Sequence, residues 1–425
     1  MPNVLEEHIE SSDVQSFIER VLESNSSSGN EDNSLDSCTV PESLNLRAML
    51  RSAKAPSQFI DDTINSERYT AKKLCTAFDI RPSLADFDRK DEKDYYALLA
   101  ALVGRELGKR VKLTEYNSVE DAVFLLQNSN NIIVLTGAGI STSLGVPDFR
   151  SKETGLYSQL QQRDGLDNPE EIFNLERFLE DPKFFYSFAN KLLPPSNGVC
   201  SPTHSFIKLL QDKGKLLTNF TQNIDNFEKN AGIDSEKLIQ WHGSFATASC
   251  TRCKEKVDGD NISQALKDGK VAQCKRCPSS EGLKPRPGRK GSKDAVTGVM
   301  KPDITFFGED IDPKFQKRLE RDRDEVDLVL IIGTSLKVTP FSNIIHELPS
   351  QVPQIYISRD HCSHNQFDIE FLGECDAVLA ELCHRAGWGL KDEMKKMENV
   401  QVKVELCQHY QSRYRFKAEH NAEHE

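Results

Sequence analysis

This chain of 425 residues lacks several features that would assign it to a class of proteins at once. Its longest apolar stretch, around Val329 to Ile332, is far too short to cross a bilayer, so we expect no membrane association. The first residues, MPNVLEEHIESSD, have neither the basic nor the apolar region of a secretory signal, which predicts an intracellular protein. Basic residues are not in excess, because 54 Lys and Arg stand against 66 Asp and Glu, for a net charge of −12. A general nucleic-acid coat and direct sequence-specific DNA binding are therefore not expected.

The cysteines lack the pattern of a disulfide framework. Their number is odd, eleven, and four of them form two C-x-x-C pairs, Cys250 with Cys253 and Cys274 with Cys277. Two such pairs can wrap one tetrahedral zinc ion, although two unrelated buried cysteine pairs would have the same spacing. Four thiolate ligands leave no open coordination position, so the pattern predicts a structural zinc.

The composition changes along the chain and suggests four regions. Residues 24–38 are polar with little to bury, so we expect segment 1–43 to be disordered. Apolar residues then recur at three- and four-residue spacing, as in YYALLAALVGREL, which predicts a helical region over 44–112. We expect the main domain over 113–390, with the zinc module inserted at about 246–300, and a charged tail over 391–425 that is helical at first and then loose.

Short, continuously apolar runs indicate a parallel sheet in the main domain. The segments NIIVLTG, VDLVLIIGTS and VPQIYIS are rich in β-branched residues, and helical stretches lie between them. Such runs are typical of strands that are buried on both faces. We therefore expect an α/β fold with a Rossmann-like, doubly wound parallel sheet, a small inserted zinc-binding module and a helical N-terminal extension.

A glycine-rich turn follows the first of these runs. Gly137-Ala138-Gly139 would let the backbone approach a pyrophosphate. Thr142 stands where the third glycine of a dinucleotide fingerprint would be, so the motif alone also fits a plain turn. The segment that follows, ISTSLGVPDFRS, has the composition of a mobile loop over a ligand.

Polar side chains follow the later strands. Gln222, Asn223 and Asp225 come after the predicted strand KLLTNF, where parallel sheets place ligand contacts, although an ordinary loop with Asp225 capping a helix would look the same. His242 directly precedes the zinc module, and its residue type suits a general base, although a lone His beside glycine is more often structural. Polar turns at 333–335, 358–360 and 373–376 supply the further edges that a long dinucleotide needs.

Several motifs, taken in order, strongly resemble the sirtuin deacetylases: GAGISTSLGVPDFRS, TQNID, WHGS, the two C-x-x-C pairs, MKPDITFFGED and GTSLKV. The resemblance covers about residues 118–388. Within it, SPTHSFIKLLQDKGKLL, TQNIDNFE and WHGSFATASC look most like the nuclear, fungal-type branch that silences chromatin. The resemblance implies a NAD-dependent protein-lysine deacetylase that acts on histone tails in the nucleus, with silencing partners bound by the N-terminal region.

The resemblance also implies a role for each motif. Catalysis would depend on His242 as general base, with Asn223 and Asp225 at the nicotinamide-side ribose. The substrate peptide would add as a strand along Thr305, Phe307, Gly308 and Glu309. The implied NAD-binding residues are Gly137, Ala138, Gly139, Ile140, Asp148, Phe149, Arg150, Tyr157, Gln222, Asn223, Ile224, Asp225, Gly333, Thr334, Ser335, Ser358, Arg359, Asp360 and Cys375.

In the implied reaction, acetyl-lysine, NAD and water give lysine, nicotinamide and O-acetyl-ADP-ribose. Acid-selective sirtuins carry a Tyr-x-x-Arg pair, but Ala189 and Leu192 stand at the matching positions here, so a neutral acyl group is favoured. Ser358 replaces the usual Asn, and Thr305 a commoner Val, which puts the affinity of these contacts in question. The basic segment 284–293 fits a nuclear import signal, a DNA-contacting loop or a plain solvated loop.

Two other functions remain open from the residues. A mono-ADP-ribosyltransferase or NAD glycohydrolase would use the same NAD site without an acyl-lysine tunnel. A non-catalytic chromatin scaffold would bind NAD and partners only, and the presence of His242, Asn223 and Asp225 argues against it.

Overall fold

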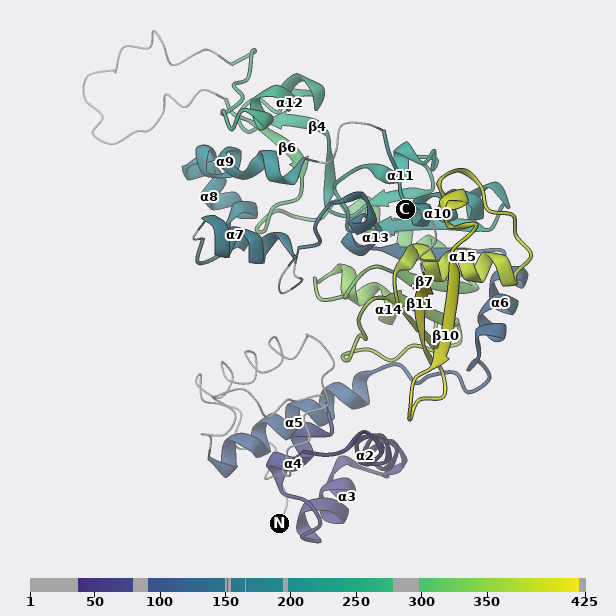
Figure 1. The fold of residues 1–425 in the computed structure, drawn as a ribbon. Coiled ribbons are helices and arrows are strands. Elements are labelled where there is room, and N and C mark those ends of the chain that lie inside the picture. Colours follow the sequence, from purple (N-terminus) through teal and green to yellow (C-terminus); the bar gives the residue numbers. More distant parts are fainter. Residues whose placement is uncertain are drawn as a thin grey trace. The chain divides into compact units, whose positions relative to one another are not determined.

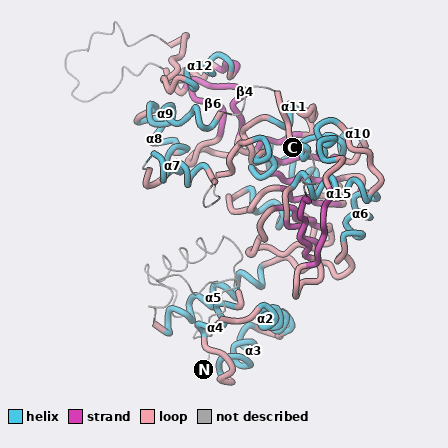
Figure 2. The backbone as a smooth tube through the Cα atoms, in the orientation of Figure 1, coloured by secondary structure: helices cyan, strands magenta, loops and turns pink. Residues whose placement is uncertain are grey.

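The computed structural model describes residues 37–78, 91–149, 151, 154–164, 166–193, 198–277 and 298–419. The chain divides into two compact units. Unit 1 comprises Met1–Ser118, Asp360–Leu372 and Val404–Arg415, and unit 2 comprises Val119–Arg359, Gly373–Lys403 and Phe416–Glu425. Figures 1 and 2 show the helices and strands of both. None of the described helices is long and apolar enough to cross a membrane.

Unit 1 is mainly helical in its N-terminal part. Its helices are α2 (Val40–Ser52), α3 (Pro56–Ile60), the π-helix η1 (Asp61–Asn65), α4 (Ala71–Thr76) and α5 (Glu92–Gly108). They pack around a core that includes Leu50, Phe59, Leu74 and Leu98. Helix α2 begins four residues before the expected boundary at 44. The reason is a capping box in which Thr39 and Glu42 satisfy each other's backbone N–H groups.

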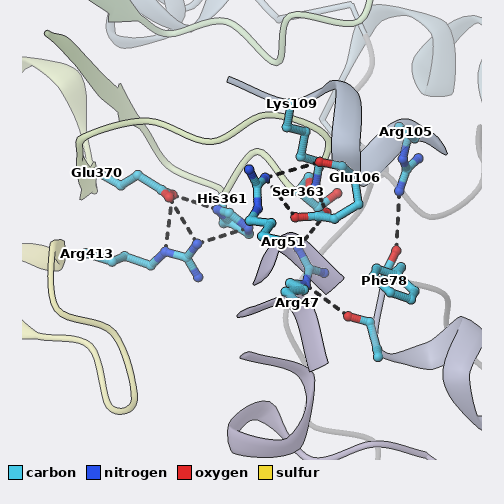
Figure 3. Close-up of polar contacts among 11 residues, drawn as sticks. Arg47, Arg51, Phe78, Arg105, Glu106, Lys109, His361, Ser363, Glu370 and Arg413 are labelled. Atoms are coloured by element: carbon cyan, nitrogen blue, oxygen red, sulfur yellow. Dashed lines mark hydrogen bonds and ion pairs between the residues drawn. The ribbon is translucent and has the colours of Figure 1, made fainter. Parts of the chain in front are cut away.

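Buried charges tie the helices of unit 1 to its 360–372 segment (Figure 3). Glu106 accepts from Arg47 at 3.3 Å, Arg51 at 3.2 Å and Lys109 at 2.8 Å. Burial opposes ionisation of Glu106, but its basic neighbours outweigh that effect and hold its pKa below the ordinary value. Lys109 also donates to the Ser363 carbonyl at 2.8 Å. The contacts of these helices are therefore formed partly with a segment more than 250 positions away in the sequence.

A second ion pair lies in the same unit. Glu370, in β9 (Ile369–Leu372), contacts His361 at 2.6 Å and Arg413 at 3.1 Å (Figure 3). Burial raises the pKa of Glu370, but the two cationic partners outweigh it and bring the pKa to about 2. Strand β9 pairs in parallel with β11 (Arg413–Glu419), beside which β10 (Gln401–Leu406) lies.

Strands β10 and β11 correct the expectation for the tail. We predicted a helix followed by loose chain after residue 390. The structure has a short 3-10 helix, η6 (Asp392–Met397), and then these two strands. The segments QVKVEL and RYRFKAE alternate apolar and charged residues, which is the period of a strand with one covered face.

Unit 2 contains the predicted parallel sheet. Its strands are β1 (Ile132–Thr136), β2 (Leu216–Thr221), β3 (Leu238–Gln240), β7 (Leu328–Ile332) and β8 (Gln354–Ser358). They lie in the order β8-β7-β1-β2-β3, and each strand runs parallel to its neighbours in this order. All residues of β1 and β7 are buried, as their continuous apolar runs indicated. The Rossmann-like fold class is thus confirmed.

Helices accompany the sheet as a doubly wound fold requires. Helix α10 contacts β2 and α15, and α15 contacts β8 and α6. The helical elements of this part are η2 (Ala138–Ile140), η3 (Thr142–Leu144), α6 (Val119–Asn128), α10 (Pro202–Asp212), α11 (Phe227–Asn230), α13 (Pro313–Asp322), η5 (Phe341–Asn343), α14 (Ile344–Glu347) and α15 (Cys375–Arg385).

The rest of unit 2 forms a smaller lobe around a three-stranded antiparallel sheet. Its strands β4 (Gly243–Cys250), β5 (Lys256–Asp258) and β6 (Met300–Ile304) lie in the order β5-β4-β6. Its helices are α7 (Leu156–Asp164), η4 (Pro169–Phe173), α8 (Leu175–Glu180), α9 (Pro182–Leu192) and α12 (Asp260–Lys267). They share one aromatic core, in which Phe306 packs against Phe173, Phe178 and Phe185. The basic segment 284–293 lies outside the described residues.

Candidate active site

The ends of β1 and β7 approach each other so closely that only glycine fits between them. Gly139 donates its N–H to the Gly333 carbonyl at 2.8 Å. A Cβ on Gly137 would meet Thr334 Cβ at 2.7 Å, and one on Gly139 would meet Gly333 Cα at 2.7 Å. Gly333 itself has a φ of 63°, in the left-handed region. These glycines therefore join the two strand ends into one edge, besides any contact they make with a ligand.

The polar residues after β2 complete this edge. Asn223 donates to the Gly137 carbonyl at 3.1 Å, and Gln222 donates to the Thr334 hydroxyl at 2.7 Å. The structure thus brings together the turns after β1, β2 and β7, which begin at Gly137, Gln222 and Gly333 and are far apart in the sequence. Carboxyl ends of parallel strands are the usual place for a ligand in such sheets.

Asp225 is held in place by two donors. The Ser141 hydroxyl donates to Asp225 Oδ2 at 2.6 Å, and the Phe227 N–H donates to Oδ1 at 3.1 Å. Burial raises the pKa of Asp225, and these hydrogen bonds partly oppose that shift. The second contact lies just before helix α11, whose N-cap residue is Asn226, so Asp225 holds the first helical N–H from outside the cap position. Ile224, next to it, packs against the aromatic core of the smaller lobe.

His242 lies between β3 and β4, where the large sheet gives way to the smaller lobe. Its Nδ1 lies 3.0 Å from the Gln222 carbonyl oxygen. A carbonyl only accepts, so the proton is on Nδ1, and in the neutral ring the basic nitrogen is then Nε2. The neighbouring Trp241 anchors the segment, because its ring packs on Phe315 and Phe341. A histidine oriented in this way is suited to accept a proton at Nε2.

The loop after η3 folds back on itself. Asp148 accepts from the Ser151 N–H at 2.7 Å and from its hydroxyl, and its carbonyl accepts from Leu156 N–H at 2.7 Å. Phe149 packs on Tyr157 and Phe173, so it extends the aromatic core toward the strand ends. Arg150 lies outside the described residues.

The residues predicted for the adenosine half lie at the end of β8 and the start of α15. Arg359 forms a bidentate ion pair with Glu374 at 2.7 and 2.8 Å and donates to the Thr142 hydroxyl at 3.1 Å. The thiol of Cys375 is buried toward the Ile357 carbonyl, so any ligand contact of Cys375 falls to its backbone. The Ser358 carbonyl accepts from Gly373 at 2.9 Å. Asp360 is exposed and belongs to unit 1, so it is not placed with these residues.

The segment predicted to bind the substrate peptide already uses much of its backbone. Thr305 donates to the His242 carbonyl at 2.8 Å, and Phe307 bonds to Phe173 at 2.7 Å and to Leu175 at 3.1 Å. The side chain of Phe307 is 46% exposed, as expected for a residue in the wall of a substrate site. A peptide could add here only through groups that these contacts leave available, such as those of Gly308, whose φ of 94° turns the chain.

Glu309 points into the protein. Its carboxylate accepts from Lys301 Nζ at 2.8 Å and from the Phe306 N–H at 2.7 Å. Lys301 is buried and also lies over the Phe306 ring, 4.1 Å from its centroid. Glu309 therefore acts as a clamp that holds the 305–309 segment in place. The expectation from the sequence was a direct contact of Glu309 with the substrate peptide.

Replacing Glu309 with alanine is expected to destabilise this clamp. The buried ammonium of Lys301 would lose its charged partner, at a cost of about 2 kcal/mol in the free energy of unfolding. Denaturant unfolding of the two proteins measures the loss. Glu309→Gln is the matched control, since its amide oxygen can still accept from Phe306 and should lose less. Equal stability of the alanine variant and the parent protein would show that the clamp contributes nothing.

The four predicted zinc ligands come together. Cys250 Sγ lies 3.7 Å from Cys277 Sγ, Cys253 Sγ lies 3.7 Å from Cys274 Sγ, and all four sulfurs are within 4.8 Å of one another. A tetrahedral ion with Zn–S bonds of ~2.3 Å places its sulfurs ~3.8 Å apart, so this donor set fits zinc. A Cβ on Gly298 would meet Cys250 Sγ at 2.5 Å, which shows how closely the backbone encloses the group. Zinc bound here would fix β4 and the following knuckle.

Some residues of the site were not singled out from the sequence. Ser141 holds Asp225, Ser201 donates to the Ile140 carbonyl at 2.7 Å, and Lys301 anchors Glu309. Ser141 falls within the quoted GAGIS motif, and Ser201 is the cap of α10 in the pattern S-P-T-H. Local spacing could identify Ser201 as a cap, but nothing local connects it to the loop after β1.

Comparison with known proteins agrees with this arrangement. The model of the Sir2 family matches residues 137–340. The NAD-dependent histone deacetylase sir2 of Schizosaccharomyces pombe is 43% identical over 353 residues, which cover 79% of this chain and 74% of that protein. The chain belongs to the Sir2 family.

Other relatives extend the comparison. The NAD-dependent protein deacetylase HST1 of Saccharomyces cerevisiae is 44% identical over 71% of this chain and 62% of that protein. The human NAD-dependent protein deacetylase sirtuin-1 is 45% identical over 66% of this chain and 35% of its own length. The chain thus spans from about a third to three-quarters of the length of these relatives.

Proposed function

We propose that this protein is a NAD-dependent protein-lysine deacetylase that acts on acetylated histones in the nucleus and takes part in chromatin silencing. Family membership and the names of the relatives support the reaction, and the fungal relatives that are named histone deacetylases support the substrate. The residues that the proposed reaction requires are gathered at one place, the edge formed by the turns after β1, β2 and β7.

The observation that carries the proposal is the orientation of His242 beside that edge. The Gln222 carbonyl fixes the proton on Nδ1 and leaves Nε2 as the basic nitrogen. Gln222 is itself held by Thr334, so the base and the strand ends form one connected set. In the proposed reaction, NAD supplies the ADP-ribosyl group that accepts the acetyl group, with nicotinamide as leaving group. His242 would take a proton from a ribose hydroxyl, while Asn223 and Asp225 orient that ribose.

The surrounding lobe suits a reaction that must exclude water. Phe306 is buried and Phe307 is partly exposed, so the two define an apolar wall. The Tyr-x-x-Arg positions hold Ala189, which is buried, and Leu192, and neither offers a cation to an acidic acyl group. Both features favour acetyl-lysine as substrate.

Mass spectrometry of one reaction tests the proposal. Purified protein is incubated with an acetylated histone-tail peptide, with and without NAD. We expect loss of the acetyl group and formation of O-acetyl-ADP-ribose only when NAD is present. An unchanged peptide with release of nicotinamide would replace the proposal by a transferase or glycohydrolase. If NAD also stayed intact in a zinc-loaded sample, the scaffold function would be favoured.

Partner binding is a separate part of the proposal. We infer that silencing partners bind the helices α2 to α5 of unit 1. These helices have their own core, and they carry exposed apolar side chains at Leu44 and Leu107. Single exposed apolar residues are ordinary on a protein surface, so the inference is supported by the separate core of these helices and by the likeness to the fungal Sir2 relatives.

A further inference from the structure

A buried polar cluster lies directly behind Asp225. His204 of α10, Asp225 and Glu228 of α11 offer ligand atoms that all lie within 4.8 Å of one another. His204 and Glu228 are fully buried, and Asp225 is 8% exposed. The proposed reaction uses only Asp225, so two buried ionisable side chains have no assigned role.

The hydrogen bonds of Ser201 fix the tautomer of His204. The Ser201 hydroxyl lies 2.7 Å from the Ile140 carbonyl and 2.7 Å from His204 Nδ1. Because a carbonyl only accepts, the hydroxyl proton goes to Ile140, and Nδ1 must donate to the Ser201 oxygen. The Ser201 N–H also approaches Nδ1, at 3.2 Å, in the capping box of α10. A protonated Nδ1 cannot accept from it, and the shorter contact with the hydroxyl, at 2.7 Å, decides the tautomer. Burial lowers the pKa of His204 to about 3, so the ring is neutral.

Neutral His204 with its proton on Nδ1 presents a bare lone pair at Nε2. This nitrogen is buried and has no hydrogen-bond partner among the described residues. A buried acceptor without a donor is costly, so a donor is expected close by. The cluster contains two acids, and one of them can supply the proton.

The two acids differ in their environment. Asp225 accepts from the Ser141 hydroxyl and the Phe227 N–H, which is the environment of an ionised carboxylate. Within the described part of the chain, neither oxygen of Glu228 has a partner in hydrogen-bonding geometry. Burial first, and then the charge of Asp225, raise the pKa of Glu228 to about 8. The Thr221 hydroxyl and Lys229 favour its charged form but do not reverse that shift. A single proton shared by the pair therefore resides on Glu228.

A bound metal cation, like a proton, could neutralise the two buried carboxylates of this cluster. Each oxygen of Asp225 already accepts one hydrogen bond, so at most three side chains, one of them shared with Ser141 and Phe227, are left as ligands, one short of a closed zinc site. Zinc sites use three or four protein ligands, and magnesium or calcium requires about six oxygen ligands in total. The geometry favours a proton.

We propose that Glu228 is a neutral carboxylic acid whose O–H group donates a hydrogen bond, through one water molecule, to His204 Nε2, and that this pair positions Asp225 as the single negative charge offered to the ligand. The identity of that ligand, the ribose of NAD, rests on the function proposed above. Glu228 and His204 are positioning residues. They keep a second carboxylate charge away from Asp225, and they connect α10 and α11 to the loop after β1 through Ser201 and Ile140.

The test compares Glu228→Gln with the parent protein across pH. Glutamine keeps a neutral donor for His204 but has no proton to lose. A raised folded-state pKa means that Glu228 contributes stability that is complete below its unfolded pKa of about 4.5 and is lost as pH rises to about 8. The melting temperature of the variant should therefore rise relative to the parent between pH 5 and pH 8, by on the order of 2–4 °C for each kcal/mol involved. Glu180→Gln, at an exposed carboxylate of α8, is the matched control and should show no such trend.

Activity gives a second readout. The parent protein should lose kcat/KM for NAD as the pH rises above about 8, and the ratio of its kcat/KM to that of Glu228→Gln should fall over that range. A difference in melting temperature that does not depend on pH would overturn the proposal, and so would a glutamine variant that fails to fold. A chelator that lowers the melting temperature of the parent protein further than that of Glu228→Gln, beyond the loss that both show at the cysteine site, would identify a cation instead. The thermal measurement requires no deacetylation, so failure of the proposed reaction would leave it unaffected.

Tautomer assignment of His204 by ¹⁵N NMR provides an independent check. In the parent protein at neutral pH, Nε2 should show the shift of an unprotonated nitrogen and Nδ1 that of a protonated one. The reverse assignment would contradict the donor role of Glu228.

Discussion

Deacetylation by a His242→Ala variant is expected to fall by about 10²–10⁴-fold, because the reaction would lose its general base. The imidazole Nδ1 donates to the Gln222 carbonyl, and the packing of this segment depends on the neighbouring Trp241. Zinc content and the melting temperature should therefore stay close to those of the parent protein. Single-turnover kinetics with acetylated peptide and NAD measures the loss.

Two further variants make the result specific. His242→Asn can still donate to Gln222 but offers no basic nitrogen, so it should be as inactive as the alanine variant. His346→Ala removes an exposed histidine of α14 and should retain full activity. Near-normal turnover of His242→Ala with an intact fold would rule out the assigned role of His242.

Cys274→Ser is expected to abolish zinc binding and, with it, the folded state of the smaller lobe. Cys274 is buried and lies 3.7 Å from Cys253, so it cannot be replaced by solvent. Structural zinc contributes about 10–16 kcal/mol in small zinc peptides, far more than a single core contact. Deacetylation should be lost indirectly, since β4 leads from His242 to Cys250.

Metal analysis and thermal unfolding measure this effect together. We expect bound zinc in the parent protein and almost none in the variant, with a lower or additional unfolding transition. Cys407→Ser, at a cysteine outside the cluster, is the control and should keep its zinc. A strong chelator should reproduce the Cys274→Ser result in the parent protein. A zinc-free variant with the parent melting curve would show that these cysteines have no structural metal.

Much of the fold could be predicted from local sequence patterns. The runs NIIVLT, LVLII and QIYIS are short, continuous and β-branched, and each became a buried parallel strand. The alternation in QVKVEL and RYRFKAE was equally local, and the expected loose tail was wrong because that period was overlooked. The capping box at Thr39 is also a local pattern that was overlooked, and it starts α2 ahead of the expected boundary.

The candidate site depended on contacts that spacing does not reveal. Glu309 looked like a substrate contact, but a buried lysine eight positions earlier turns its carboxylate inward. Gly137 and Gly139 looked like a phosphate-binding turn, and their closest neighbours in the structure are Gly333 and Thr334.

Residues within one or two turns of chain were enough to predict the strands β1, β2, β7 and β8, the paired cysteines and the polar turns at strand ends. Only the tertiary structure decided which of these turns meet. It placed Ser141 on Asp225, His242 on Gln222, and His204 beside Glu228. Such pairs are set by how the parallel strands align and how the helices pack on them. They determine where protons reside and which charges are buried, and these are properties of three-dimensional neighbours rather than of spacing along the chain.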